Sequence, residues 1–407
     1  MFPMAAPFMH ANLAAAADRF GERAAVRAGD ACWSFRDLDG LSNAFARHLS
    51  TRGIRAGDRV AVMTANRVEF ITTVYAVSKL GAAAVLLSPA WKSTEVGHAL
   101  DLTGPVHGVA DAESAPLLAE TIGENVTDLD RAADLFAHST AALGSDPPGG
   151  SAESVLVFSS GTTGLPKAVR HTHDSIGHAT AHWRTVLGLG PDDRFGVATP
   201  PSHILGLLNL LTAVAAGASV RLYRRFDLDE VLQRIAAEKM TLEMAVAPIA
   251  LAMANHPRLE AYDLSSLRYI MWGATPVSES VARVVTERTG VRWLPAYGAS
   301  ELPVIAANPV DRPESWRLDS AGLPPPGVEL RIADLESGKV LLAGEVGEIQ
   351  VRSPSAMARY LPDDATADAF ADGWYRTGDV GWLEPEGWVH LTDRSKEMIK
   401  VLSLIHI

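Results

Sequence analysis

A loop rich in glycine and hydroxyl side chains follows the apolar segment 155–158 and ends at Lys167. Glycines let backbone N–H groups come close to an anion, Ser and Thr hydroxyls donate further hydrogen bonds, and the lysine adds positive charge. The spacing differs from the Walker pattern, and the composition alone would also fit a flexible surface loop. The ordered string predicts a phosphate-binding loop made of Ser159, Ser160, Gly161, Thr162, Thr163, Gly164 and Lys167.

A second polar cluster, from Tyr297 to Glu301, follows the apolar segment 291–296. Ligand sites in parallel sheets form at the carboxyl ends of strands, so this position suits one. A carboxylate is the ligand that a hard cation such as Mg²⁺ prefers. Taken alone, the cluster would equally be an ordinary helix start.

Other candidate residues lie in turns that are common in any protein. Gly273 to Pro276 follow the apolar segment 267–272, and Tyr375 leads to Asp379 through a Gly-Asp turn. His203 lies just before a long apolar stretch, and a lone histidine is more often structural than functional. These motifs gain weight only from their order along the chain.

In that order and approximate spacing, the motifs resemble those of the adenylate-forming superfamily of acyl-CoA synthetases, coumarate-CoA ligases, luciferases and peptide-synthetase adenylation domains. The string 159–167 is almost identical to the loop of that family, and 297–301 is similar to its Tyr-Gly-x-Thr/Ser-Glu signature. The resemblance extends to Val401. It implies the large N-terminal domain of such an enzyme.

The resemblance also implies which residues bind ATP and magnesium. It places Lys167 and Ser300 on the phosphates, Glu301 on the magnesium ion, and Tyr297 near the adenine with Gly298 beside it. Lys167 and Glu301 would then be catalytic, since they stabilise the charge on the phosphates.

For the sugar, the resemblance implies that Asp379 accepts hydrogen bonds from both ribose hydroxyls and that Arg394, which follows Asp393, reaches the ribose or a phosphate. The backbone of the glycine-containing turn would lie against the adenine and the acyl site. That turn contributes Gly273, Ala274 and Thr275.

The acid would be held near His203, which the resemblance places beside the acyl pocket as a further catalytic residue. Peptide-synthetase domains commonly have an aspartate in this segment, and none occurs from 200 to 211, which disfavours an α-amino acid. The apolar residues here, together with Trp272, suggest an acid with a fatty or aryl tail. Trp272 would equally fit the core.

The end of the chain resembles the hinge before a mobile C-terminal lid, with Lys396 at the hinge and Lys400 on a second nucleotide-contacting face. We expect hinge and truncated lid over 394–401 and a non-native tail over 402–407, because the letters LSLIHI match a translated sequencing-library adapter. A natural lidless variant is the alternative. A missing lid would impair activity.

The hydrophobic pattern predicts the helices and strands that must position these residues. Apolar segments such as 59–64, 82–87 and 194–199 alternate with helical patterns such as 67–80 and 228–238. This alternation predicts an α/β fold with two parallel-rich sheets flanked by helices.

The domain expected over 1–393 divides into three ranges. A Gly-, Pro- and Ser-rich loop at 140–154 separates 1–150 from 151–309, and short strands after residue 309 predict a small β-barrel-like subdomain over 310–393. The segments 328–333, 339–343, 347–352 and 388–392 read as its strands.

Bulk properties restrict the partners. The 407 residues carry a net charge of -12, which disfavours a nucleic-acid surface, and Cys32 is the only cysteine, which fits a reducing cytoplasm. No signal peptide or membrane span is evident.

We therefore expect an acid-thiol ligase whose partners are ATP, Mg²⁺, a carboxylic acid and CoA. It would form an acyl-adenylate, release pyrophosphate and transfer the acyl group to CoA. A ligase that loads a carrier protein and a silent nucleotide-binding module are the alternatives.

Overall fold

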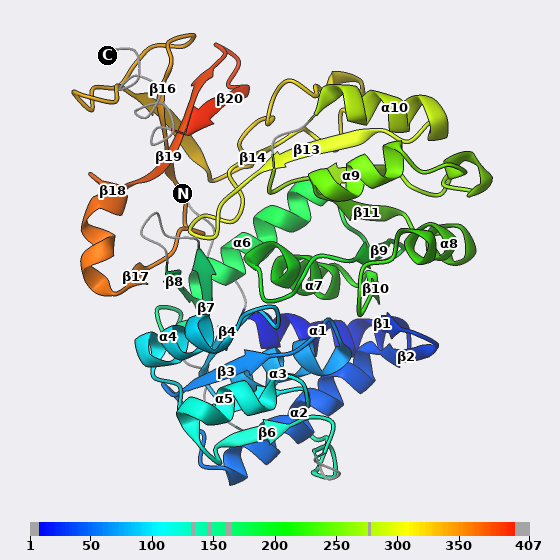
Figure 1. Ribbon diagram of the computed structural model, residues 1–407, viewed down its shortest axis with the longest axis vertical. Coiled ribbons are helices and arrows are strands. Elements are labelled where there is room, and N and C mark those ends of the chain that lie inside the picture. The colour runs from blue at the N-terminus through cyan, green and yellow to red at the C-terminus, as the bar shows by residue number, and fades with distance from the viewer. Residues whose placement is uncertain (1–7, 132–134, 145–148, 160–164, 276–277, 395–407) are drawn as a thin grey trace.

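The computed structural model describes residues 8–131, 135–144, 149–159, 165–275 and 278–394. Strands and helices alternate up to residue 297 and give way to short strands and turns afterwards. The predicted α/β fold, with two parallel-rich helix-flanked sheets and a small β subdomain, is confirmed (Figure 1). No helix in these ranges is both long and apolar enough to cross a membrane.

A seven-stranded sheet has the strand order β17-β8-β7-β4-β3-β5-β6 (Figure 1). Strands β7, β4, β3, β5 and β6 are parallel, and at one edge β8 pairs antiparallel with β7 and β17 pairs antiparallel with β8. Alternate side chains face α2 and α3 on one side and α4 and α5 on the other. The bounds are β3 (Arg59–Met63), β4 (Ala83–Leu86), β5 (His107–Ala110), β6 (Val126–Asp128), β7 (Glu153–Ser159), β8 (Lys167–Thr172), β17 (Arg359–Leu361), α2 (Phe35–Thr51), α3 (Val68–Lys79), α4 (Ser93–Thr103) and α5 (Ala115–Ile122).

An eight-stranded sheet has the order β14-β13-β12-β11-β9-β10-β1-β2. Helices α1, α6 and α7 share an apolar core with the first sheet, and α8, α9 and α10 cover the opposite face. The bounds are α1 (Met9–Phe20), β1 (Ala24–Ala28), β2 (Ala31–Ser34), α6 (His173–Leu187), β9 (Arg194–Val197), α7 (Ile204–Ala216), β10 (Ser219–Leu222), α8 (Leu228–Glu238), β11 (Leu242–Ala245), α9 (Ala247–Ala254), η1 (Leu259–Ala261), β12 (Tyr269–Trp272), α10 (Glu279–Thr289), β13 (Trp293–Tyr297) and β14 (Ala306–Ala307).

A small antiparallel sheet has the order β15-β16-β19-β18, with β20 paired to β19. The predicted strand 339–343 is wrong: this segment belongs to the β15–β16 connection, with one isolated bridge at Val340 and an exposed Leu342. A run of apolar residues favours a strand, but it does not show whether another strand lies beside it to pair with. The bounds are η2 (Pro313–Ser315), β15 (Glu329–Ala333), β16 (Gly347–Arg352), η3 (Asp363–Ala369), β18 (Phe370–Ala371), β19 (Trp374–Leu383) and β20 (Val389–Arg394).

The three sheets do not coincide with the expected ranges 1–150, 151–309 and 310–393. Strands β1 and β2 precede residue 150 and yet join the eight-stranded sheet, whereas β7, β8 and β17 follow it and complete the seven-stranded one. Strand pairing thus crosses the predicted boundary at residue 150 in both directions, and the sheets do not define the three ranges. The ranges stay a prediction about subdomains.

The loop after β3 joins the two large sheets. The Asn66 Nδ2 group donates to the carbonyl oxygens of Val197 at 2.9 Å and Tyr223 at 3.1 Å, which lie at the carboxyl ends of β9 and β10. The backbone N–H of Ala65 donates to Asp111 Oδ2 at 2.9 Å and fixes this loop. A buried amide therefore ties the carboxyl ends of both sheets together.

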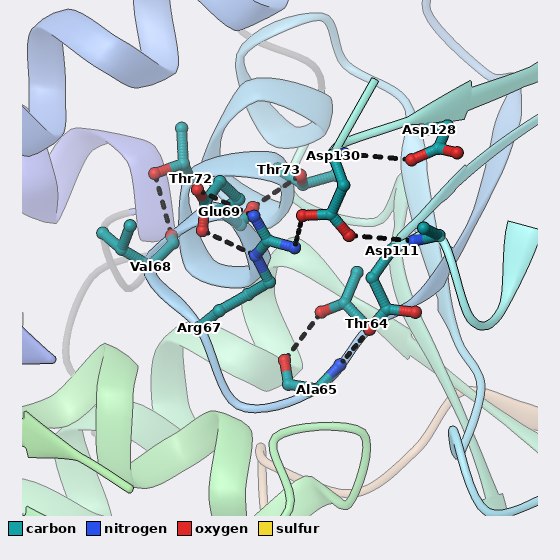
Figure 2. A network of polar contacts seen from close by, with 11 residues as sticks. Thr64, Ala65, Arg67, Val68, Glu69, Thr72, Thr73, Asp111, Asp128 and Asp130 are labelled. Carbon is teal, nitrogen blue, oxygen red and sulfur yellow. Dashed lines mark hydrogen bonds and ion pairs between the residues drawn. The ribbon is translucent and has the colours of Figure 1, made fainter. Parts of the chain in front are cut away.

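Beside Asn66, Arg67 closes the same end of the seven-stranded sheet (Figure 2). Its guanidinium pairs with Glu69 at 2.8 Å and with Asp130 at 2.7 Å. The backbone N–H of Ala112, and after it Arg67, lower the pKa of Asp130. The Arg67 guanidinium is held by two carboxylates of the same sheet end, so we read this network as structural.

Candidate active site

The ends of the predicted phosphate loop lie side by side at one edge of the seven-stranded sheet. Ser159 ends β7 and Lys167 begins β8, and the two residues are paired in antiparallel register. The loop between them therefore leaves and re-enters the sheet at one point. The predicted residues Ser160, Gly161, Thr162, Thr163 and Gly164 lie outside the described part of the chain.

The turn after β13 places Glu301. A Cβ atom on Gly298 would lie 2.1 Å from the carbonyl oxygen of Pro303, so this position requires glycine. The N–H of Ile305 donates to the carbonyl of Tyr297 at 2.9 Å, and the chain reverses into β14. This reversal buries the Glu301 side chain at the carboxyl end of the sheet.

Tyr360 connects the phosphate loop to Glu301. Its hydroxyl donates to Glu301 Oε1 at 2.8 Å, and its ring centroid lies 5.3 Å from Lys167 Nζ. Burial, and after it the charge of Glu301, raise the pKa of Tyr360, so its hydroxyl remains a donor at neutral pH. Two segments far apart in the sequence thus meet on one tyrosine that the sequence did not single out.

His171 also ties β8 to the same turn. Its Nε2 atom lies 2.8 Å from the carbonyl oxygen of Ser300, and its Nδ1 atom lies 3.1 Å from Ser175 Oγ. Because a carbonyl only accepts, Nε2 carries the proton. Burial lowers the pKa of His171 to about 4, so the ring is neutral. No sequence signal distinguished His171 from the other histidines.

The predicted adenine and ribose residues meet at a second point. The Tyr297 hydroxyl donates to Asp379 Oδ2 at 2.6 Å. Asp379 lies on β19, where its backbone N–H donates to Thr377 Oγ1 at 3.0 Å, and it is paired in register with Arg394 on β20. The Arg394 side chain, Lys396 and Lys400 lie outside what the structure describes.

The turn after β12 lies beside the Tyr297 motif, because Trp272 and Pro295 are paired in parallel register. Gly273 begins it, and Ala274 has a φ of 63°, which is unfavourable for a residue with a Cβ atom. Thr275 Oγ1 accepts from the Ala247 N–H at 3.1 Å. Backbone strain of this kind is found at ligand sites.

Trp272 itself belongs to the core. It is 1% exposed, and its ring centroid lies 5.0 Å from that of Trp293 in the apolar cluster under α9 and α10. Its indole N–H donates to Thr275 Oγ1 at 3.2 Å. The interpretation of Trp272 as a core residue therefore fits the structure better than its interpretation as a residue that lines the acyl pocket.

His203 directly precedes α7, to which its side chain makes no capping hydrogen bond, and borders a cavity of about 300 Å³. Burial lowers the pKa of His203, so it is neutral at pH 7. The cavity brings His203 together with the predicted Ser159. Its walls combine apolar and polar side chains, namely Leu86, Ser88, Trp91, Glu95, Phe158, Ser159, Pro166, Ser202 and His203.

The described residues contain no group of three or more His, Cys, Asp or Glu side chains that could hold a metal ion by themselves. Within 4.0 Å, neither Lys167 nor Glu301 forms an ion pair with any described residue. Each charge is therefore left for a ligand that carries the opposite charge.

Known proteins are similar to this chain in sequence and in fold. A family model described as AMP-binding enzyme matches residues 13–361. A feruloyl-CoA synthase from Amycolatopsis sp. is 32% identical over 388 residues, which cover 92% of this chain and 76% of that protein.

Solved structures are similar over nearly the whole chain. The inhibitor-bound N-terminal domain of FACL13 from Mycobacterium tuberculosis has a TM-score of 0.88 at 26% identity, covering 95% of this chain and 99% of that one. The anthranilate CoA ligase AuaEII in complex with anthranoyl-AMP has a TM-score of 0.89 at 25% identity, covering 97% and 79%. With a family model over most of its length and relatives that share its fold, this chain belongs to the AMP-binding enzyme family.

Proposed function

We propose that this chain uses ATP to convert a fatty or aryl carboxylic acid into an acyl-adenylate and then transfers the acyl group to CoA. The observation that carries the proposal is the meeting of Lys167 with Glu301 at Tyr360 and of Tyr297 with Asp379. The names of the relatives support it, since one is a feruloyl-CoA synthase and another holds anthranoyl-AMP, an acid joined to AMP.

Glu301 fits a ligand of the magnesium ion that would accompany ATP. Its carboxylate is buried, accepts a hydrogen bond from a neutral hydroxyl and has no ion pair with the described residues. A buried carboxylate without a cation is costly, and Mg²⁺ prefers such an oxygen ligand. When bound, the ion would neutralise charge on the phosphates.

In the proposed reaction, a carboxylate oxygen of the acid forms a bond with the α-phosphorus. The bond from that phosphorus to the oxygen that bridges to the β-phosphate breaks, and pyrophosphate leaves. Lys167 would compensate the phosphate charge, and Asp379 would hold the ribose in place. The CoA sulfur would then attack the acyl carbonyl, and AMP would leave.

The cavity beside His203 is where we propose that the carboxyl end of the acid lies. Because the ring is neutral at pH 7, His203 would offer a hydrogen bond without adding a charge. The neighbouring Trp91 and Phe158 rings pack with centroids 5.1 Å apart and give the cavity an apolar wall. This wall suits an uncharged tail.

The test is ATP–pyrophosphate exchange with a panel of fatty and aryl acids, together with calorimetric measurement of ATP binding. We expect exchange that depends on the acid, and a decrease of about 100-fold in Lys167→Met. Lys339→Met, which changes an exposed lysine in the β15–β16 connection, is the matched control.

Each alternative has its own outcome. Binding of ATP without exchange for any acid would favour the silent nucleotide-binding module. Exchange followed by a thioester on a carrier protein and not on CoA would favour the carrier-loading ligase. Absence of ATP binding would contradict the proposal altogether.

A further inference from the structure

We propose that Tyr360 is a positioning residue that holds Lys167 and Glu301 apart, so that each can serve the nucleotide instead of neutralising the other. This inference rests on the proposed function. It assigns a role to a residue outside every predicted motif, on a strand from a distant part of the chain.

Strand β17 brings Tyr360 to the site. Tyr360 is paired in antiparallel register with Val169 of β8, two residues after Lys167, so Lys167 and Tyr360 are diagonal neighbours on one face of the sheet. The backbone around Tyr360 is held from two sides. The Ala358 N–H donates to the carbonyl of Arg170 at 2.8 Å, and the Met357 N–H donates to the carbonyl of Glu301 at 2.7 Å.

The backbone that carries Tyr360 is thus bonded directly to both of the segments that its side chain connects. The Tyr360 N–H donates in addition to Thr366 Oγ1 at 2.9 Å, which ties this strand to the following helix η3. The position of the phenol ring is therefore set by the sheet edge and by the Glu301 turn together.

The Tyr360 side chain contacts both the Lys167 ammonium and the Glu301 carboxylate without neutralising either charge. Its ring faces Lys167 Nζ at 5.3 Å, a cation–π contact that leaves the ammonium N–H groups available for phosphate oxygens. Its hydroxyl binds Glu301 Oε1, and a carboxylate can accept at several further positions. A direct lysine–glutamate pair would occupy the groups that the nucleotide and its metal ion need.

Tyr375 supports the same arrangement from β19. Burial, and after it the charge of Glu301, raise the pKa of Tyr375, and Tyr360 and Tyr297 also act on it. A second neutral hydroxyl therefore lies near the same carboxylate. Loss of the Tyr360 hydroxyl should leave the fold intact while changing how Glu301 is held.

The test is calorimetric titration of the 407-residue chain with ATP at a series of Mg²⁺ concentrations. In Tyr360→Phe, which keeps the ring and removes the hydroxyl, we expect the Mg²⁺ concentration for half-maximal ATP affinity to rise by about fivefold or more. ATP affinity without Mg²⁺ should change by less than about twofold, because the contact with Lys167 remains. Tyr360→Leu should in addition weaken ATP binding at saturating Mg²⁺.

Tyr269→Phe is the matched control, because it removes a buried tyrosine hydroxyl that donates to the carbonyl of Leu187, away from the site. It should leave the Mg²⁺ dependence unchanged. A Tyr360→Phe protein with the Mg²⁺ dependence of the unaltered chain would overturn the role of Tyr360 alone. An unaltered chain that binds no ATP at any Mg²⁺ concentration would overturn the proposed function and this inference together.

Discussion

Asp379 illustrates how single side chains are prepared for a ligand. It lies on β19, accepts the Tyr297 hydroxyl at 2.6 Å, and its backbone N–H is held by Thr377. Thr377 in turn donates to the carbonyl of Ile349 on β16 at 2.7 Å. The carboxylate is therefore oriented by neighbours on other strands before any sugar hydroxyl arrives, which reduces the entropy cost of binding.

Replacement of this carboxylate tests the ribose assignment. Asp379→Asn keeps the size and loses the charge, so ATP affinity should fall by about 10-fold or more, since hydrogen bonds to charged groups are the stronger ones. Calorimetry measures it, with the exposed Asp364→Asn as control. Binding of inorganic tripolyphosphate, which has no ribose, should not change. Equal loss for both ligands would contradict a role on the sugar.

At the scale of elements, the site depends on how strands end. β12 and β13 are parallel neighbours and end together, which brings the turn at Gly273 beside Tyr297. β8 begins where β7 ends and passes directly into α6, whose first turn is capped by Thr172 and Ser175. The same sheet edge thus supplies Lys167 and, through His171, holds the Ser300 carbonyl.

The turn between β13 and β14 should tolerate almost no change. In Gly298→Ala, the added Cβ would meet the Pro303 carbonyl oxygen at 2.1 Å, and backbone would have to move. We expect the free energy of unfolding to fall by about 2 kcal/mol or more. Gly97→Ala on α4, where nothing lies within 4 Å, should instead add about 0.5–1 kcal/mol. Urea unfolding of both variants checks this, and unchanged stability in Gly298→Ala would contradict it.

The whole molecule carries many buried histidines, which make its stability depend on pH. Five histidines bind a proton more weakly when folded than at the ordinary pKa of 6.5, so stability that is present above pH 6.5 is lost as the pH falls toward 4. Burial is the largest cause in every case. It lowers the pKa to about 4 in His10, His107, His171, His173 and His182.

Glu243 acts in the opposite direction. Burial in β11 raises its pKa from 4.5 to about 8, so its contribution is present below pH 4.5 and is lost as the pH rises to 8. The two trends predict maximal stability at about pH 6.5–7. Glu243→Gln should remove the decline on the alkaline side, as measured by urea unfolding at pH 5, 6.5 and 8. The exposed Glu386→Gln is its control, and a flat profile in the unaltered chain would contradict the prediction.

Local patterns in the sequence predicted many of the helices and strands, and the order of the motifs along the chain supplied the candidate residues. The predicted helix 228–238 matches α8, and the apolar segment 59–64 matches β3, because hydrophobic period and turn chemistry are properties of adjacent residues. The motif around Lys167, the acidic Glu301 and the Gly-Asp pair at Asp379 were singled out by their resemblance to the adenylate-forming family, since each alone would also fit an ordinary turn or loop.

Only the tertiary structure decided which of these segments meet. No local pattern shows that β1 and β2 join the strands after residue 190, or that β17 pairs with β8. Those pairings bring Tyr360 into contact with Lys167 and Glu301. They also bring His171 to the carbonyl of Ser300. Strand pairing depends on which strand edges are free once the whole core has formed, so no single segment of the sequence reveals it.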